Sequence, residues 1–220
     1  MSNINEEKIV YFIRHGQSEG NISPVYQSAD SPLSEEGKNQ ANLIAERIGK
    51  ISFDVLISSP LPRTKETSEA ITKITGKTPE YSDLFVERIK PTLLGGKPHD
   101  DIEAKNLNKE WNKSLYKSGL RAEDGENFDD IISRADKALE FLQNRNEKTI
   151  VVVTHGFFLR TIIAKVLLGD SLNGDNFWNF QSRVTMENTG LSVLKYGKYS
   201  KDYGDTSWRL WIYNDHSHLG

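Results

Sequence analysis

In Ile9-Val10-Tyr11-Phe12-Ile13-Arg14-His15-Gly16, five apolar residues run directly into arginine, histidine and glycine. The pattern returns in Ile150-Val151-Val152-Val153-Thr154-His155-Gly156, with threonine in place of the arginine. Short runs rich in β-branched and aromatic residues are typical of buried strands in a parallel sheet. Because ligands bind at the carboxyl ends of such strands, we expect the two histidines to meet in one pocket.

The composition of the chain sets outer bounds on its class. Its 220 residues are enough for one domain with a sizeable core, and we expect a single domain over residues 1–220. A net charge of −3 gives no reason to expect a nucleic-acid partner or an anionic membrane surface. The chain has no cysteine, which excludes thiolate catalysis, disulfides and zinc–sulfur sites and fits a reducing compartment.

Targeting signals are absent from the sequence pattern. Residues 1–8 are polar and acidic, without the basic start and apolar core of a signal peptide. No apolar stretch approaches the roughly 20 residues of a membrane helix. We therefore expect a cytoplasmic protein.

The chain outside these two stretches alternates helices with strands. A helix is predicted after Ser34, because one buried face is formed by Ala41, Ile44, Ala45 and Ile48. A strand over residues 53–58 precedes a helix for which Ser59 is the expected N-cap, with Pro60 at the first helical position. Another helix is predicted after His155. This alternation predicts an α/β three-layer sandwich, with a mostly parallel central sheet and helices on both faces.

The segment from about residue 81 to 126 has a weaker pattern of charges and single aromatic residues. We interpret it as an insertion over the active site, partly helical around residues 101–116. The helix that follows has a buried stripe formed by Ile131, Ala135, Ala138, Leu139 and Leu142. Strands are predicted over 191–194 and 208–213, with a hairpin turn over 195–206. The last strand either pairs across a homodimer or completes the sheet.

Two arginines indicate that the pocket binds a phosphate group. Arg14 and Arg63 each follow a predicted strand, and a guanidinium group matches two phosphate oxygens while staying protonated. Gly16 and Gly156 allow close approach of the backbone, and the helix after His155 directs its first N–H groups at the ligand. Asn21 either contributes an amide to the phosphate or caps a turn. The strand ends lack the carboxylates of a metal site, so we expect neither a metal nor a cofactor.

Histidine is the preferred candidate nucleophile in a chain without cysteine. A neutral imidazole can attack phosphorus without losing a proton, and neighbouring arginines disfavour its protonated form. Because Arg14 adjoins His15, His15 is preferred over His155, which taken alone could be a structural histidine. The leaving oxygen needs a proton, and Glu87 is the candidate acid, with Glu19, Glu103 and Glu126 as alternatives.

These residues resemble the histidine phosphatase superfamily, in its phosphoglycerate mutase-like branch. The resemblance rests on Arg14-His15-Gly16, Ser58-Ser59-Pro60-Leu61-Pro62-Arg63-Thr64, Glu87 and Thr154-His155-Gly156, which occur in the family's order. It extends over most of the chain, including Asp124-Gly125-Glu126-Asn127-Phe128 and Glu187-Asn188-Thr189-Gly190. It implies that His15 becomes phosphorylated, that Glu87 donates the proton, and that phosphate is held by Arg14, Asn21, Arg63, His155 and Gly156.

One departure from the family pattern bears on the reaction. Mutases of this family usually carry Glu-Arg-His-Tyr-Gly at the acid position, whereas this chain has Glu87-Arg88-Ile89-Lys90-Pro91. The expected function is therefore metal-independent hydrolysis of small phosphorylated molecules through a phosphohistidine. The alternatives are a cofactor-dependent phosphoglycerate mutase and a non-catalytic phospholigand-binding module. Anionic substrates could contact basic residues of the 81–126 segment, or these residues could simply be solvated: Lys90, Lys97, His99, Lys105 and Arg121.

Overall fold

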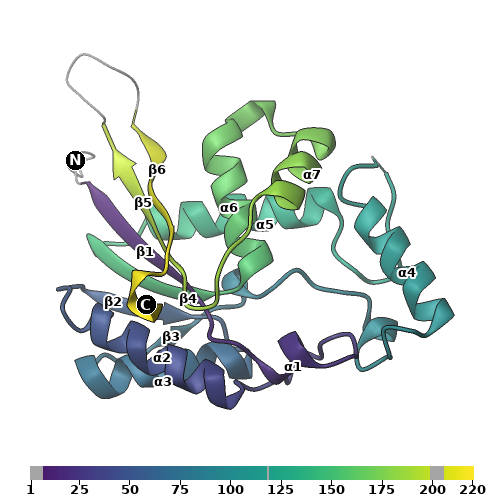
Figure 1. Cartoon of the computed structure of the whole chain (residues 1–220). Coiled ribbons are helices and arrows are strands. Elements are labelled where there is room, and N and C mark those ends of the chain that lie inside the picture. Colours follow the sequence, from purple (N-terminus) through teal and green to yellow (C-terminus); the bar gives the residue numbers. More distant parts are fainter. Residues whose placement is uncertain (1–6, 118, 199–205) are drawn as a thin grey trace.

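The computed structural model describes residues 7–117, 119–198 and 206–220, and its centre is one six-stranded sheet (Figure 1). The strand order is β3-β2-β4-β1-β5-β6. The bounds are β1 Lys8–Arg14, β2 Val55–Ser58, β3 Glu80–Tyr81, β4 Thr149–Thr154, β5 Leu191–Gly197 and β6 Ser207–Asp215. The first four strands in sequence are parallel, whereas β5 and β6 are antiparallel, so the predicted mostly parallel sheet is confirmed.

Helices cover both faces of the sheet, which confirms the predicted three-layer arrangement (Figure 1). One face is covered by α2 (Glu35–Ile48) and α3 (Pro62–Thr75). The other is covered by α5 (Phe128–Gln143), α6 (Gly156–Leu168) and α7 (Gly174–Arg183). The short α1 (Glu19–Ile22) and α4 (Ile102–Lys113) lie toward the side where β1 and β4 end. The 3-10 helices are η1 Asp83–Phe85, η2 Thr92–Leu94, η3 Gly169–Ser171 and η4 Ser217–Leu219.

Alternation of side chains along the central strands builds two separate cores. On β4, Ile150 and Val152 pack with α5 and α6, while Val151 and Val153 pack with α2 and α3. All four side chains are fully buried. A strand with both faces covered needs an uninterrupted apolar run, which is why its sequence shows no polar alternation.

The predicted start of the second helix is confirmed and that of the third is wrong. Ser34 caps α2 by accepting a hydrogen bond from the Gly37 N–H. The N-cap of α3 is Leu61, with Pro62 and not Pro60 at the first helical position. Either proline can occupy the first position of a helix, and in the structure the hydroxyl of Ser59 bonds to His155 instead of capping α3.

The segment over residues 81–126 contains η1, η2 and α4, so its predicted helical part is confirmed. Arg88, near the start of this segment, contacts residues near its end. The Arg88 side chain is buried, and its guanidinium stacks 3.8 Å from the centre of the Trp111 ring. The Arg88 guanidinium also donates to the carbonyl oxygens of Trp111 and Glu126. No helix within the described residues is long and apolar enough to cross a membrane.

The C-terminal strands are longer than predicted. Residues Lys195 to Gly197 belong to β5 rather than to a turn, and Gly197 is in register with Ser207. Residues 199–205 of the predicted turn lie outside the described residues. β6 completes the sheet as its edge strand. The sequence interpretation missed α7, because only Phe177 and Gln181 of this helix are buried.

Candidate active site

The two histidines meet where β1 and β4 end side by side. Arg14 is in register with Thr154, so the residues that follow both strands emerge at the same edge of the sheet. The rings of His15 and His155 lie 5.1 Å apart between centroids, at 62° to each other. Their exposed fractions are 3% and 0%. The central expectation from the sequence, that the two imidazoles lie together, is met by this geometry.

The hydrogen bonds of His15 assign different roles to its two ring nitrogens. Nδ1 lies 2.6 Å from the Gly16 carbonyl oxygen, which can only accept, so Nδ1 carries the proton. Nε2 therefore presents a lone pair, which accepts a hydrogen bond of 3.2 Å from Arg63 Nε. Arg63 reaches this position from the first turn of α3. Gly16 is required by packing, since a Cβ there would lie 2.4 Å from the Gly37 carbonyl oxygen.

His155 is oriented by Ser59, a residue that we had predicted to be a helix cap. His155 Nε2 lies 2.8 Å from Ser59 Oγ. Ser59 Oγ also accepts a weak hydrogen bond of 3.4 Å from the Leu61 N–H, so its own proton is available to His155. In the tautomer whose Nε2 accepts from Ser59, the ring proton is on Nδ1, which is buried and has no partner among the described residues.

Arg14 is the second cation of the site. Its Nη1 donates to the Met186 carbonyl oxygen, and its Nε is buried without a partner among the described residues. A Cβ at Gly156 would lie 3.0 Å from Arg14 Nε, so glycine gives this side chain its space at the start of α6. Unpaired buried donors cost about 1–3 kcal/mol each, which favours an acceptor at this point.

Burial and positive charge keep both imidazoles neutral. The pKa of His15 lies well below its usual value because of burial and the nearby guanidinium groups of Arg63 and Arg14. Burial and the Arg63 guanidinium also lower the pKa of His155 well below that value. Burial lowers the pKa of Arg63 to about 10, so this arginine remains protonated at neutral pH. The site therefore combines neutral imidazoles with fixed positive charge, which is suited to an anionic ligand.

Glu87 lies at the same end of α6 as His155 and Gly156. Its carboxylate accepts hydrogen bonds from the N–H groups of Phe158, at 3.0 Å, and Phe157, at 3.3 Å. A carboxylate is favoured at this position by the partial positive charge of the helix N-terminus. Its negative charge also raises the pKa values of Arg14 and Arg63, against the effect of burial. The structure therefore brings Glu87 to the predicted site.

The alternative acids and Asn21 are placed elsewhere. Glu19 and Glu103 are exposed, and Glu126 is committed to an ion pair of 2.7 Å with Arg134. Asn21 is exposed on α1, and its side chain accepts a hydrogen bond from the Ser18 N–H in a capping box. This bond is the one expected of a turn cap, and the contact of Asn21 with a phosphate group stays a prediction.

Three supporting residues were missed by the sequence interpretation. Arg134 on α5 donates to the carbonyl oxygens of Val86 and Glu87 and thereby holds the backbone of the candidate acid. The Asn188 side chain and the Thr189 N–H both donate to the His15 carbonyl oxygen. Thr189 adopts a positive φ of 57°, which is rare for a β-branched residue. The segment around Asn188 was noticed as a family motif, but nothing local indicated that it contacts His15.

A large cavity opens beside these residues. Its volume is about 1120 Å³, and Arg63 and Glu87 both line it. The remaining walls come from residues 27–29, from the 82–95 part of the predicted insertion and from the start of α5. Among the described residues, no group of three or more His, Asp or Glu side chains is arranged to hold a metal ion.

Comparison with known proteins identifies the family. A family model described as "Histidine phosphatase superfamily (branch 1)" matches residues 10–206. The chain belongs to the histidine phosphatase superfamily, as its sequence motifs predicted. This membership also confirms the predicted enzyme class, a phosphatase-type enzyme built around histidine.

Named relatives carry a mutase name. A Photorhabdus laumondii protein named "Probable phosphoglycerate mutase GpmB" is 32% identical over 164 residues, which are 72% of this chain and 74% of that protein. A Yersinia pestis protein of the same name is 28% identical over 191 residues, which are 85% of this chain and 84% of that protein.

Solved structures with the same fold carry phosphatase names. The alpha-ribazole phosphatase from Shigella flexneri has a TM-score of 0.75 at 19% identity, covering 94% of this chain and 96% of that chain. A mycobacterial glucosyl-3-phosphoglycerate phosphatase has a TM-score of 0.72 at 23% identity, covering 95% of this chain and 99% of that chain. At these identities the likeness establishes the fold alone, and it agrees with the predicted α/β sandwich.

Proposed function

We propose that this protein hydrolyses phosphate monoesters of small molecules through a phosphohistidine formed on His15, without a metal or cofactor. The observation that carries the proposal is the division of roles on the His15 ring, with Nδ1 held by the Gly16 carbonyl and Nε2 facing Arg63. A nucleophile needs a lone pair directed at the bound phosphate, and a fixed proton on the other nitrogen supplies it. The adjacent guanidinium groups of Arg14 and Arg63 provide the binding site for the phosphate group of the substrate.

The phosphate group is held by donors that the protein leaves unpaired. Arg14 Nε and His155 Nδ1 are both buried without partners among the described residues, and each carries a proton to donate. Arg63 adds its guanidinium, and in the bound state its hydrogen bond shifts from His15 Nε2 to a phosphate oxygen. Donors placed in advance around the developing charge are the main source of catalysis in phosphoryl transfer.

The reaction takes two displacements at phosphorus. His15 Nε2 forms a bond to phosphorus while the bond to the ester oxygen breaks, and Glu87 gives that oxygen a proton. This step requires the protonated form of Glu87, which becomes a carboxylate as its proton moves to the ester oxygen. Water then attacks the phosphohistidine, Glu87 takes a proton from it, and inorganic phosphate leaves with His15 restored.

A mutase is the second candidate, since the curated relatives with the highest identities reported above are named as phosphoglycerate mutases. The sequence Ile89-Lys90-Pro91 after the acid departs from the mutase pattern and supports hydrolysis instead. The two reactions differ in the acceptor of the phosphoryl group, which is water in a phosphatase and the substrate in a mutase.

Product analysis distinguishes these functions. The purified protein is incubated with p-nitrophenyl phosphate and, separately, with 3-phosphoglycerate, each with and without a chelator, and the products are followed by phosphorus NMR. We expect inorganic phosphate at the same rate with chelator present. Conversion of 3-phosphoglycerate to its 2-isomer without phosphate release would establish the mutase. Turnover of neither compound nor of any other monoester would leave only a binding module.

Two further expectations remain predictions. A cytoplasmic location rests on the cysteine-free composition, and a homodimer rests on the exposed edge of β6. The single-domain organisation and the role of residues 81–126 in covering the site are likewise proposals, supported by the contribution of residues 82–95 to the cavity wall.

A further inference from the structure

The cavity beside the candidate active site is much larger than a small phosphorylated acid requires. Its volume of about 1120 Å³ is slightly above the range of pockets that bind drug-sized ligands, roughly 300–1,000 Å³. Arg63 and Glu87 line it, so it begins at the phosphate site and receives the alcohol part of an ester. Much of its wall is apolar, from Leu61, Leu84, Val86, Ile89 and Pro91. Such a wall gains free energy by covering an apolar group of the substrate.

Lys90 is the distinctive charge of this cavity. It is half-buried, and its ammonium group donates to the Gln27 carbonyl oxygen across the cavity wall. Within the described residues it forms no ion pair with a carboxylate, although an ammonium group has three N–H donors. Burial and the nearby Arg63 guanidinium lower its pKa, and the Glu87 carboxylate opposes them. Lys90 thus lies close to the reacting groups with donors to spare.

Arg63 is assigned to the phosphoryl group, and the two other arginines of the wall are already occupied. Arg134 pairs with Glu126 at 2.7 Å, and Arg88 donates to backbone carbonyls within the 81–126 segment. The remaining lysine of the wall, Lys137, is exposed. A partly buried cation without a direct ion pair gains from a ligand that supplies the opposite charge.

We propose that the substrate is a phosphate monoester of a bulky, largely apolar alcohol that carries one further anionic oxygen group, a carboxylate or a second phosphate, which pairs with Lys90. This inference rests on the proposed function, because it assigns the alcohol part of the same ester. It makes Lys90 a specificity-determining residue rather than a catalytic one.

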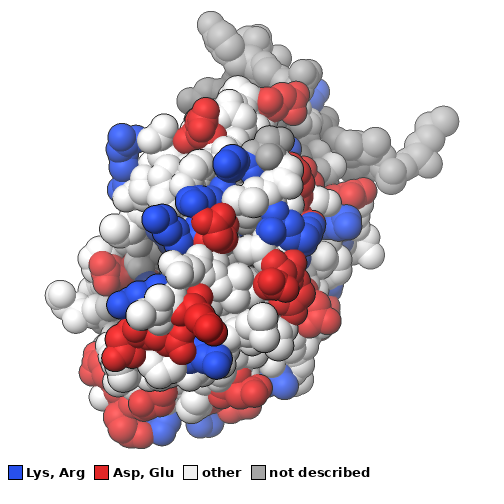
Figure 2. All heavy atoms as spheres, turned by 90° about the vertical axis from the view of Figure 1, so that its right-hand side faces the viewer, with Lys and Arg blue, Asp and Glu red and all other residues white. Residues whose placement is uncertain are grey.

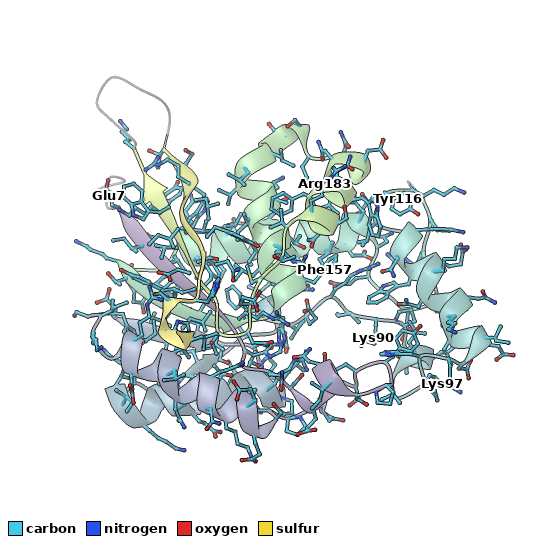
Figure 3. All side chains as sticks on the ribbon, in the orientation of Figure 1. Glu7, Lys90, Lys97, Tyr116, Phe157 and Arg183 are labelled. Atoms are coloured by element: carbon cyan, nitrogen blue, oxygen red, sulfur yellow. The ribbon has the colours of Figure 1, made fainter. Side chains whose placement is uncertain are left out.

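The selectivity for an anionic substrate must then come from the position of Lys90 and not from the overall electrostatic potential of the surface. Figure 2 shows basic and acidic side chains interspersed over the face it presents, without one large area of a single sign. Lys97 offers a matched control on the same segment. It is exposed and does not line the cavity, and in Figure 3 it lies farther out than Lys90.

The test compares 2-naphthyl phosphate, 6-carboxy-2-naphthyl phosphate and the 2,6-naphthyl bisphosphate, with 3-phosphoglycerate as the small anionic ester. In the unmodified protein we expect kcat/KM for one of the anionic naphthyl esters to exceed that for the neutral ester by about tenfold, the effect of one charge-assisted hydrogen bond. Lys90→Gln should remove this advantage and change the neutral ester by less than about twofold. Lys90→Arg should retain most of it, and Lys97→Gln should change nothing.

Several outcomes would overturn the inference. If Lys90→Gln lowers kcat/KM equally for neutral and anionic esters, Lys90 contacts the phosphoryl group instead. If the anionic esters keep their higher kcat/KM in this variant, Lys90 does not recognise the second anionic group. A higher kcat/KM for 3-phosphoglycerate than for every naphthyl ester would refute the bulky alcohol. Calorimetric binding of the matching naphthylmethyl phosphonates repeats the comparison without turnover. If the protein is inactive but binds the phosphonates in the predicted Lys90-dependent way, the proposed hydrolysis is refuted and the role of Lys90 in recognition is not.

Discussion

The Nε nitrogen of Arg63 donates a hydrogen bond of 3.2 Å to the Nε2 nitrogen of His15, the ring nitrogen that carries the lone pair. These residues are 48 positions apart. His15 follows β1 and Arg63 lies in the first turn of α3, the helix after β2, and β1 and β2 flank β4 in the sheet. The guanidinium fixes the direction of the lone pair and disfavours protonation of the ring. The same arrangement can direct both the nucleophile and a bound anion.

Replacement of His15 tests the nucleophile. We expect His15→Asn to lower kcat for p-nitrophenyl phosphate by at least about a thousandfold, because asparagine cannot form the phosphoenzyme. Rapid quenching of the unmodified protein should trap an acid-labile phosphoryl group that mass spectrometry locates on His15. A phosphorylated His155, or turnover retained by His15→Asn, would contradict the assignment.

Replacement of Glu87 tests the acid. Glu87→Gln keeps a carbonyl oxygen that can accept from the Phe158 N–H, so the start of α6 should be preserved. Alkyl phosphates need protonation of the leaving oxygen, whereas p-nitrophenolate leaves without it. We expect kcat to fall about a hundredfold or more for an alkyl phosphate and less than about tenfold for p-nitrophenyl phosphate. Equal losses for the two esters would exclude Glu87 as the acid.

The buried histidines predict a specific dependence of stability on pH. Burial and neighbouring cations lower the pKa values of His15 and His155 in the folded protein well below those of the unfolded chain. Above the unfolded value near 6.5 neither state binds the proton, and stability is complete. As the pH falls below that value, only the unfolded chain binds it, so each histidine lowers the free energy of unfolding by about 1.4 kcal/mol per pH unit.

Urea denaturation between pH 7.5 and 5.0 measures this dependence. The His15→Asn protein should lose stability more slowly with falling pH than the unmodified protein, by the contribution of one proton. Because His15 stays neutral in the folded protein, kcat/KM should show no loss near pH 6.5 attributable to its protonation. Parallel stability curves for the two proteins would contradict the neutral, buried state of His15.

The pair of Arg134 with Glu126 predicts a link between the insertion and the core. Their side chains are 12% and 10% exposed, and Arg134 also donates to the Val86 and Glu87 carbonyl oxygens. We expect Arg134→Met to lower the free energy of unfolding by about 3–5 kcal/mol, since it removes the ion pair of a buried carboxylate and the donor of three backbone carbonyls. Chemical denaturation measures the change.

The exposed pair of Arg121 with Asp130 provides the control for this prediction. Its side chains are 49% and 35% exposed, so Arg121→Met should cost less than about 1 kcal/mol. Comparable losses in the two variants would show that Arg134 contributes no more than a surface charge. A lowered kcat in the folded Arg134→Met protein would further support its role in positioning Glu87.

Much of the fold was predictable because its signals are local. A short apolar run such as residues 150–153 buries all of its side chains in a strand that is covered on both faces. The spacing of the apolar residues from Ala41 to Ile48 places them on one face of a helix. The start of α3 was not predictable, because Pro60 and Pro62 give equivalent local signals. In the folded protein Ser59 is not the cap, and its hydroxyl bonds to His155, 96 residues away.

The sequence by itself determined which chemical groups stand at the strand ends: two histidines, each followed by glycine, with arginine in reach. Strand pairing then brings the histidines together, since parallel β1 and β4 end at one edge. Only the tertiary structure decided the proton position on the His15 ring, the capping of α6 by Glu87, and the place of Lys90 in the cavity wall. These depend on burial and on contacts between residues distant along the chain, and no local pattern of side chains encodes them.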